Sequence, residues 1–169
     1  MTNATYTIAQ LTPAHAADWQ ALRLASIRDF PLGFLPTEAE AARIPLSDLA
    51  TRLELGNDWG IFSEGTLVGF CNCRRQTFER TRHRAEIGPF FITAQHHGTP
   101  AATQLMTFII DTARTDGVEQ LELYVDSGNH RAMRFYERMG FKQVASLPNM
   151  VKIDGQSRDD YFYTLSLAP

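Results

Sequence analysis

The chain has 169 residues, of which 44% are hydrophobic and 21% are charged, and its formal net charge is −3. This composition excludes a disordered, collagen-like or coiled-coil chain, and the length predicts a single domain over residues 1–169. A chain so near neutrality lacks the positive surface that wrapping duplex nucleic acid requires. No apolar run approaches the roughly 18 residues of a membrane span, so no membrane contact is expected.

Cysteine usage is typical of a reduced protein. Cys71 and Cys73 are the only cysteines, and their spacing places both on one face of a strand, where they are poor disulfide partners. No further ligands stand near them at zinc spacing, so no metal is expected. Met1–Gln10 has no basic stretch followed by an apolar core, which predicts no signal peptide and a cytoplasmic location.

Hydrophobic periodicity predicts an alternation of strands and helices. This order indicates the α/β class, with a mixed, mostly antiparallel sheet of about six or seven strands and helices on both faces. The strands are expected at Tyr6–Leu11, Trp59–Ser63, Leu67–Arg75, Ala85–Ile92, Leu121–Val125, Phe141–Leu147 and Tyr161–Leu167. The helices are expected from Pro13 to a break at Phe30–Gly33, from about Thr37 to Leu55, at Thr99–Thr115 and at Asn129–Met139.

Turn and cap residues support these boundaries. Thr12 is the expected N-cap of the first helix, ahead of Pro13. Pro45 interrupts the second helical stretch, and Ser47 offers a new cap. Glu64-Gly65-Thr66 is a hairpin signal between two strands.

The segment from Ile92 to Leu105 carries the first functional signal. An apolar strand ends, a loop with Gly98 follows, and a helix begins. The start of a helix offers backbone N–H groups and the positive end of its dipole, so this loop is a natural phosphate site. Because every strand-to-helix connection has such a loop, the alternative is a loop that serves the fold alone.

A second motif follows that helix at a fixed distance. A strand leads to an Asn, a helix carries an Ala and a Phe-Tyr pair, and a Gly-Phe enters the next strand. In this order and register the chain resembles the GNAT superfamily of acyl-CoA-dependent N-acyltransferases, most clearly over Ile61–Val144. The resemblance implies a GNAT-like single domain with acetyl-CoA as co-substrate and no metal. The matching residues are Asn129, Ala132, Phe135, Tyr136, Gly140 and Phe141.

The pyrophosphate loop departs from the usual family pattern. His97 stands where Arg is common, and Pro100 stands where the central Gly is common; Gln95 with Gly98 offers an alternative alignment displaced by two residues. Proline has no N–H and neutral histidine carries less charge, so the loop loses part of its capacity for phosphate. The resemblance still implies that acetyl-CoA is held by Phe91, Ile92, His97, Gly98, Thr99, Ala101, Ala102, Asn129 and Tyr136.

Transfer of an acyl group from a thioester to an amine requires three events. The amine loses a proton, the carbonyl oxygen is stabilised, and the leaving thiolate is protonated. The resemblance implies that the Ile92 N–H polarises the carbonyl and that Tyr136 protonates the sulfur, the alternative for Tyr136 being a packing role. Glu86 is the candidate base because its apolar strand would desolvate the carboxylate. The alternatives for Glu86 are an ion pair with Arg84 or another nearby arginine, and a water chain as the base.

The family resemblance places acceptor specificity in Phe30–Pro36 and in about Leu147–Tyr163. Aromatic and acidic side chains there suit a cationic amine, whereas the arginines between residues 74 and 84 favour the opposite charge. The relevant side chains are Phe30, Phe34, Tyr161, Tyr163, Asp159 and Asp160.

The expected function is an N-acetyltransferase that moves an acetyl group directly from acetyl-CoA to a primary amine of a small molecule or peptide. The expected partners are that acceptor and a second copy of the chain. His97 and Pro100 favour a second hypothesis, a catalytically silent GNAT domain that binds acyl-CoA as a sensor or scaffold. A third hypothesis is a GNAT-shaped protein with no CoA site.

Overall fold

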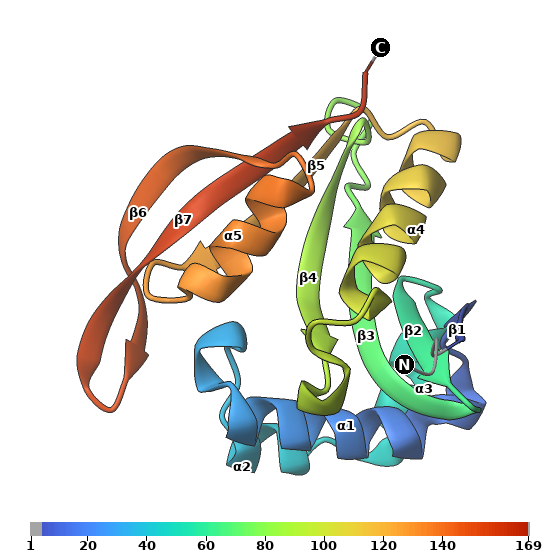
Figure 1. Cartoon of the computed structure of the whole chain (residues 1–169). Coiled ribbons are helices and arrows are strands. Elements are labelled where there is room, and N and C mark those ends of the chain that lie inside the picture. The colour runs from blue at the N-terminus through green and yellow to red at the C-terminus, as the bar shows by residue number, and fades with distance from the viewer. Residues whose placement is uncertain (1–4, 169) are drawn as a thin grey trace. The chain divides into compact units, whose positions relative to one another are not determined.

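The computed structural model describes residues 5–168, and its elements follow the predicted order (Figure 1). Pro169 and the first four residues of Met1–Gln10, where no signal peptide was expected, lie outside the described residues. The helices are α1 (Ala16–Asp29), α2 (Glu38–Ala42), α3 (Leu46–Glu54), α4 (Ala101–Thr115) and α5 (His130–Arg138). The strands are β1 (Tyr6–Gln10), β2 (Asp58–Ser63), β3 (Thr66–Arg75), β4 (Arg84–Ile92), β5 (Gln120–Asp126), β6 (Lys142–Ile153) and β7 (Gln156–Ser166).

Backbone hydrogen bonds join seven strands in the order β1-β2-β3-β4-β5-β7-β6. β4 and β5 run parallel, whereas β1–β2, β2–β3, β5–β7 and β6–β7 are antiparallel pairs. The predicted mixed α/β fold is therefore confirmed. No helix within residues 5–168 combines the length and the apolar character that a membrane span requires.

The chain divides into two compact units. Among the described residues, the first unit comprises 5–73 and 89–108, and the second comprises 74–88 and 109–168. β4 and α4 each contribute residues to both units.

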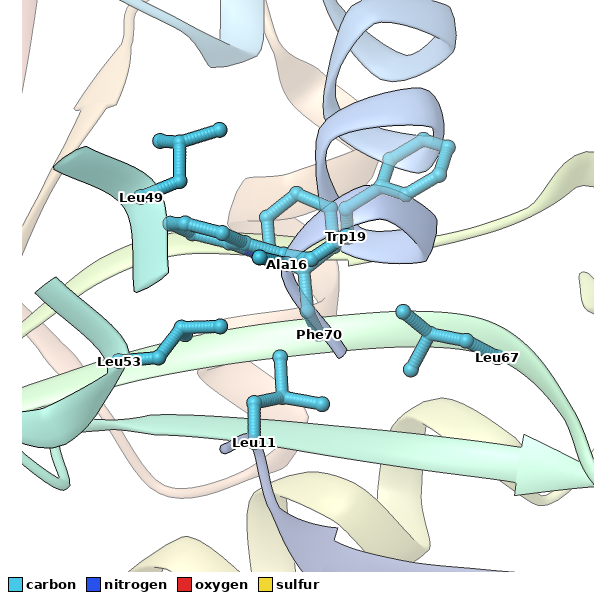
Figure 2. Packing of buried hydrophobic residues seen from close by; sticks show 8 residues of the cluster. Leu11, Ala16, Trp19, Leu49, Leu53, Leu67 and Phe70 are labelled. Atoms are coloured by element: carbon cyan, nitrogen blue, oxygen red, sulfur yellow. The ribbon is translucent and has the colours of Figure 1, made fainter. Parts of the chain in front are cut away.

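The hydrophobic core of the first unit lies between its helices and strands (Figure 2). Trp19 of α1 meets Phe70 of β3 edge to face, with ring centroids 6.3 Å apart. Leu49 and Leu53 are one helical turn apart on α3, and both are 2% exposed. Each large apolar side chain that is fully buried in this way stabilises the fold by roughly 1.5–3 kcal/mol.

The predicted interruption at Pro45 is confirmed, but the predicted cap at Ser47 is wrong. Pro45 itself is the N-cap of α3, with an extended ψ of 148°. Its carbonyl accepts the N–H groups of Asp48 and Leu49, so the helix has already begun before Ser47. The Ser47 hydroxyl instead donates to Asp48 Oδ1 at 3.2 Å.

Two hairpins close on two-residue turns with a positive φ at both positions. The predicted β2–β3 turn uses Glu64 (φ 50°) and Gly65 (φ 79°), and the β6–β7 turn uses Asp154 (φ 50°) and Gly155 (φ 76°). Both are turns whose twist matches that of the flanking strands.

The β6–β7 hairpin is longer than predicted. The strand was predicted at Phe141–Leu147, yet β6 continues to Ile153. The pairing register shifts between Leu147 and Val151, so these residues form an irregularity that the strand passes through. β6 lies at the edge of the sheet, where proline and bulges are tolerated because the outer N–H groups need no strand partner.

The register of β5 and β7 gives the second unit two distinct sheet faces. On one face Leu121 and Leu123 stand opposite Leu165 and Tyr163, and the Tyr163 hydroxyl donates to Glu137 of α5 at 3.2 Å. This face therefore packs against α5. The opposite face, called the polar face below, carries Glu122, Tyr124 and Asp126 of β5 facing Thr164, Phe162 and Asp160 of β7.

Candidate functional site

The connection from β4 to α4 lies in the first unit and holds most of the predicted cofactor-binding residues. Phe91 and Ile92 are buried at the end of β4. Gly98 has a φ of +75°, in the left-handed region that favours glycine, and a Cβ there would meet nothing within 4 Å. Backbone conformation rather than space therefore calls for glycine at this position.

His97 holds this loop against the strand that precedes it. Its Nε2 lies 2.8 Å from the Ile92 carbonyl oxygen. Because a carbonyl can only accept, Nε2 carries the hydrogen. The ring also packs edge to face on Phe30 at 5.8 Å. His97, predicted as a weaker substitute for a phosphate-binding arginine, thus also fastens the loop.

A hydrogen-bond network ties the loop to β1. The Tyr6 hydroxyl lies 2.7 Å from His96 Nδ1 and 3.0 Å from Thr99 Oγ1. Thr99 Oγ1 donates to the His96 carbonyl at 2.7 Å and accepts the Ala101 N–H at 3.3 Å. Thr99 therefore caps the first turn of α4, and Tyr6 holds Thr99 in place. The sequence offered no signal for Tyr6, which is 93 residues away from Thr99.

Pro100 stands at the start of α4, where a missing N–H costs the helix nothing. Its carbonyl accepts the Gln104 N–H at 2.8 Å. Ala101 is fully buried and Ala102 is half-buried, so both contribute small side chains to the first turn of α4. The loop can receive an anion at the positive end of α4, with one N–H fewer than a glycine would provide.

Asn129 and Tyr136 both lie on the segment that forms α5 in the second unit. Asn129 is the N-cap of α5, and its Oδ1 accepts the Ala132 N–H at 3.2 Å. Tyr136 is 8% exposed, and its ring contacts Phe135 at 5.6 Å and Phe141 at 5.8 Å. The motif residues thus cap the helix and fix the tyrosine ring.

Glu86 lies in the part of β4 that belongs to the second unit. Its side chain is 32% exposed, so the apolar strand does not seal the carboxylate from water. Arg74 Nη2 lies 4.0 Å from Glu86 Oε2, whereas Arg84 pairs with Glu122 at 2.9 Å. The pKa of Tyr124 is raised, first by burial and then by the charges of Glu86 and Glu122. Glu86 therefore lies close to the polar face.

The ends of β5 and β7 hold a half-buried ion pair that the sequence did not reveal. Arg158 binds both carboxylate oxygens of Asp126, with its Nη2 2.6 Å from Oδ1, and Asp126 is 5% exposed. The hydrogen bonds from Arg158 hold the pKa of Asp126 below its usual value. A Cβ at Gly128 would lie 2.4 Å from Arg158 Nη2, so a larger residue there would displace the guanidinium from Asp126.

The residues predicted to form an aromatic and acidic acceptor rim lie in different environments. Phe30 and Phe34 pack on Phe91 in the first unit, with centroids 5.8 and 6.2 Å away. Tyr163 is 0% exposed and belongs to the core of the second unit, so its assignment to a rim is wrong. Asp159 is exposed and accepts the Asn149 N–H at 2.9 Å.

The structure thus divides the predicted site residues between the two units. The loop set from Phe91 to Ala102 belongs to the first, and Glu86, Asn129 and Tyr136 belong to the second. Within residues 5–168, no group of three or more His, Cys, Asp or Glu side chains is arranged to hold a metal ion.

The fold is that of acetyltransferases. The ribosomal-protein-alanine N-acetyltransferase structure from Brucella melitensis superposes with a TM-score of 0.83 at 21% identity, covering 95% of this chain and 99% of that one. The structure of yncA from Salmonella typhimurium, a protein described as a putative acetyltransferase with its cofactor acetyl-CoA, gives 0.81 at 18% identity, covering 96% and 94%.

The sequence profile of the acetyltransferase (GNAT) family matches residues 19–141. The chain belongs to the GNAT family of acetyltransferases. Mycothiol acetyltransferase of Brachybacterium faecium is 29% identical over 134 residues, which cover 75% of this chain. The match spans only 38% of the length of that relative.

Proposed function

We propose that the chain is an N-acetyltransferase that moves an acetyl group from acetyl-CoA to a primary amine of a small molecule or peptide by direct transfer. The observation that carries the proposal is the loop from His97 to Ala102 in a member of the GNAT family. Its left-handed Gly98 and the turn capped by Thr99 offer backbone N–H groups to a pyrophosphate. The yncA structure with acetyl-CoA supports the choice of donor.

Each part of the chain has a role in this proposal. The loop and the start of α4 hold the pyrophosphate, and Phe91 lines the pantetheine arm with Ile92. Asn129, which caps α5, contacts the CoA arm through its side chain. We place these roles in one cytoplasmic domain over residues 1–169, a location that suits the thiols of Cys71 and Cys73.

The chemistry is a direct attack on the thioester. The amine nitrogen bonds to the carbonyl carbon, the carbon–sulfur bond breaks, and the Ile92 N–H stabilises the charge on the carbonyl oxygen. Tyr136 gives its proton to the departing thiolate. Glu86 receives the amine proton through water, since its carboxylate is 32% exposed.

A catalytically silent acyl-CoA-binding domain is the second candidate. Pro100 removes one N–H from the loop, and His97 Nε2 is committed to the Ile92 carbonyl. Both features weaken phosphate binding relative to a loop with arginine and glycine at these positions.

Binding of acetyl-CoA and turnover test the two candidates separately. A ligand bound only to the native state at a hundredfold excess over Kd stabilises the fold by about 2.7 kcal/mol. Acetyl-CoA should therefore raise the melting temperature by a few degrees, and a primary-amine panel should release CoA. Binding without turnover supports the silent domain, and the absence of a shift at millimolar acetyl-CoA rejects the donor.

A further inference from the structure

One buried carboxylate of the second unit has no hydrogen-bond partner. Among residues 5–168, the buried acidic side chains are Asp58, Glu122, Asp126 and Asp160. Asp58 of the first unit accepts from Asn72 at 3.0 Å through Oδ1, whereas its Oδ2 has no partner, and Glu122 and Asp126 accept from arginines. No hydrogen bond within the described residues reaches the carboxylate of Asp160, although its residue is only 7% exposed.

A carboxylate that loses most of its water and accepts no hydrogen bond lowers the stability of a fold, and here the charge of Arg158 offsets only part of that cost. Burial, followed by the charge of Asp126, raises the pKa of Asp160 above its usual value. The charge of Arg158 acts in the opposite direction on Asp160, but its Nε and Nη2 hydrogen bonds both go to Asp126. Proteins keep such unfavourable polar groups mainly at functional sites, where a ligand can supply the missing hydrogen bond or counter-charge.

The neighbours of Asp160 suit a cation. Asp126 stands directly opposite it, and Tyr124 stands opposite Phe162 on the same face, two residues along each strand. The two rings lie 4.9 Å apart, and Tyr124 is 48% exposed, so the aromatic pair can be reached from solvent. A carboxylate beside aromatic faces is an arrangement that attracts ammonium groups.

We propose that Asp160, with Tyr124 and Phe162, binds an ammonium group of the acceptor and so determines the specificity of the enzyme. The inference rests on the proposed transfer to an amine. The reacting nitrogen must be neutral when it attacks, so the group that remains charged on Asp160 is a second one. The acceptor class is therefore a primary aliphatic amine with a further cationic group, such as a diamine.

Calorimetric titration of 1,4-diaminobutane into the protein with CoA present tests this inference. Asp160→Asn keeps the shape and removes a charge that no protein donor stabilises, so the variant should fold. It should weaken diamine binding roughly 10- to 100-fold, the range expected for a hydrogen bond to a charged group. Tyr124→Leu should weaken it a few-fold. Asp154→Asn, at the exposed β6–β7 turn, is the matched control and should bind as the wild type does.

The outcomes separate this inference from the proposed function. Equal diamine affinity in the wild type and Asp160→Asn, or no binding to the wild type, overturns the cation site. If acetyl-CoA still raises the melting temperature in that case, the proposed donor stands and only the acceptor assignment falls. If acetyl-CoA gives no shift, the proposed function falls, and the diamine titration alone decides whether Asp160 is a cation site.

Discussion

The loop before α4 and the polar face of the second unit differ in how far their polar groups are hydrogen-bonded. In the loop, Thr99 both donates and accepts, and Tyr6 and His97 fasten the backbone. On the polar face, Arg158 satisfies Asp126 and leaves Asp160 without a donor.

This difference separates two requirements of a transferase. A cofactor that is bound in every cycle benefits from a loop held in shape before binding, since less ordering entropy is lost. Recognition of an acceptor benefits from a group that only the correct ligand satisfies. Substitutions in the loop should therefore alter cofactor binding, and those around β5, β7 and α5 should alter stability, turnover or amine binding.

The largest effect is expected from Arg158→Ala. Removal of Arg158 leaves the buried Asp126 carboxylate without its counter-charge and its two hydrogen bonds, so the free energy of unfolding should fall clearly, although solvent around the half-exposed guanidinium limits the loss. Urea denaturation near neutral pH measures the loss. The double variant with Asp126→Asn should recover much of it, and a single variant within about 0.5 kcal/mol of the wild type would show that the pair is not structural.

Tyr136→Phe should lower kcat about 100-fold, at the lower end of general acid catalysis, because thiolates leave readily. KM for acetyl-CoA should barely change, since the hydroxyl acts in the transition state. The ring contacts with Phe135 and Phe141 remain, so the melting temperature serves as the control. Full kcat in the variant would leave water as the proton donor. A raised KM alone would make the hydroxyl a cofactor-binding group.

Pro100→Gly, in the loop before α4, should change the affinity for acetyl-CoA. A restored N–H can bind a phosphate oxygen, and the gain exceeds the entropy cost of glycine, so acetyl-CoA should bind roughly fivefold tighter. Calorimetric titration measures this change. Pro148→Gly, at the irregularity in β6, carries a similar entropy cost away from the loop and should leave the affinity unchanged. Unaltered or weaker binding in Pro100→Gly would mean that the loop does not use this N–H.

The smallest effect concerns the pH dependence of stability. The folded-state pKa of Asp160 lies above its usual value. The stabilisation that Asp160 contributes to the fold is therefore fully present below the usual pKa and is lost as pH rises through the folded-state pKa. Asp126 has a lowered pKa and acts in the opposite sense, losing its contribution as pH falls. Urea denaturation at intervals from about pH 4 to 7 should show that the free energy of unfolding of Asp160→Asn increases relative to that of the wild type as pH rises. Parallel curves for the two proteins would contradict this assignment.

The sequence alone determined the elements and the family, because these depend on short-range rules. Periodicity identified the helices and strands, Asn129 was correctly placed at the start of α5, and Gly140 at its end has a φ of +94°. The order of the motif from Asn129 to Phe141 indicated the family that the profile match then showed. The N-cap of α3 was wrong by two residues, since Ser47 and Pro45 both carry helix-start signals.

Only the tertiary structure decided which side chains satisfy one another. Tyr6 and Thr99 are 93 residues apart, and Asp126 and Arg158 are 32 apart, so no local pattern links either pair. The β5–β7 register placed Asp160 opposite Asp126 on the polar face, and a shift of one residue would have turned it to the other face. Burial and hydrogen bonding depend on such long-range pairings, and these distinguish the satisfied carboxylate of Asp126 from the unpartnered one of Asp160.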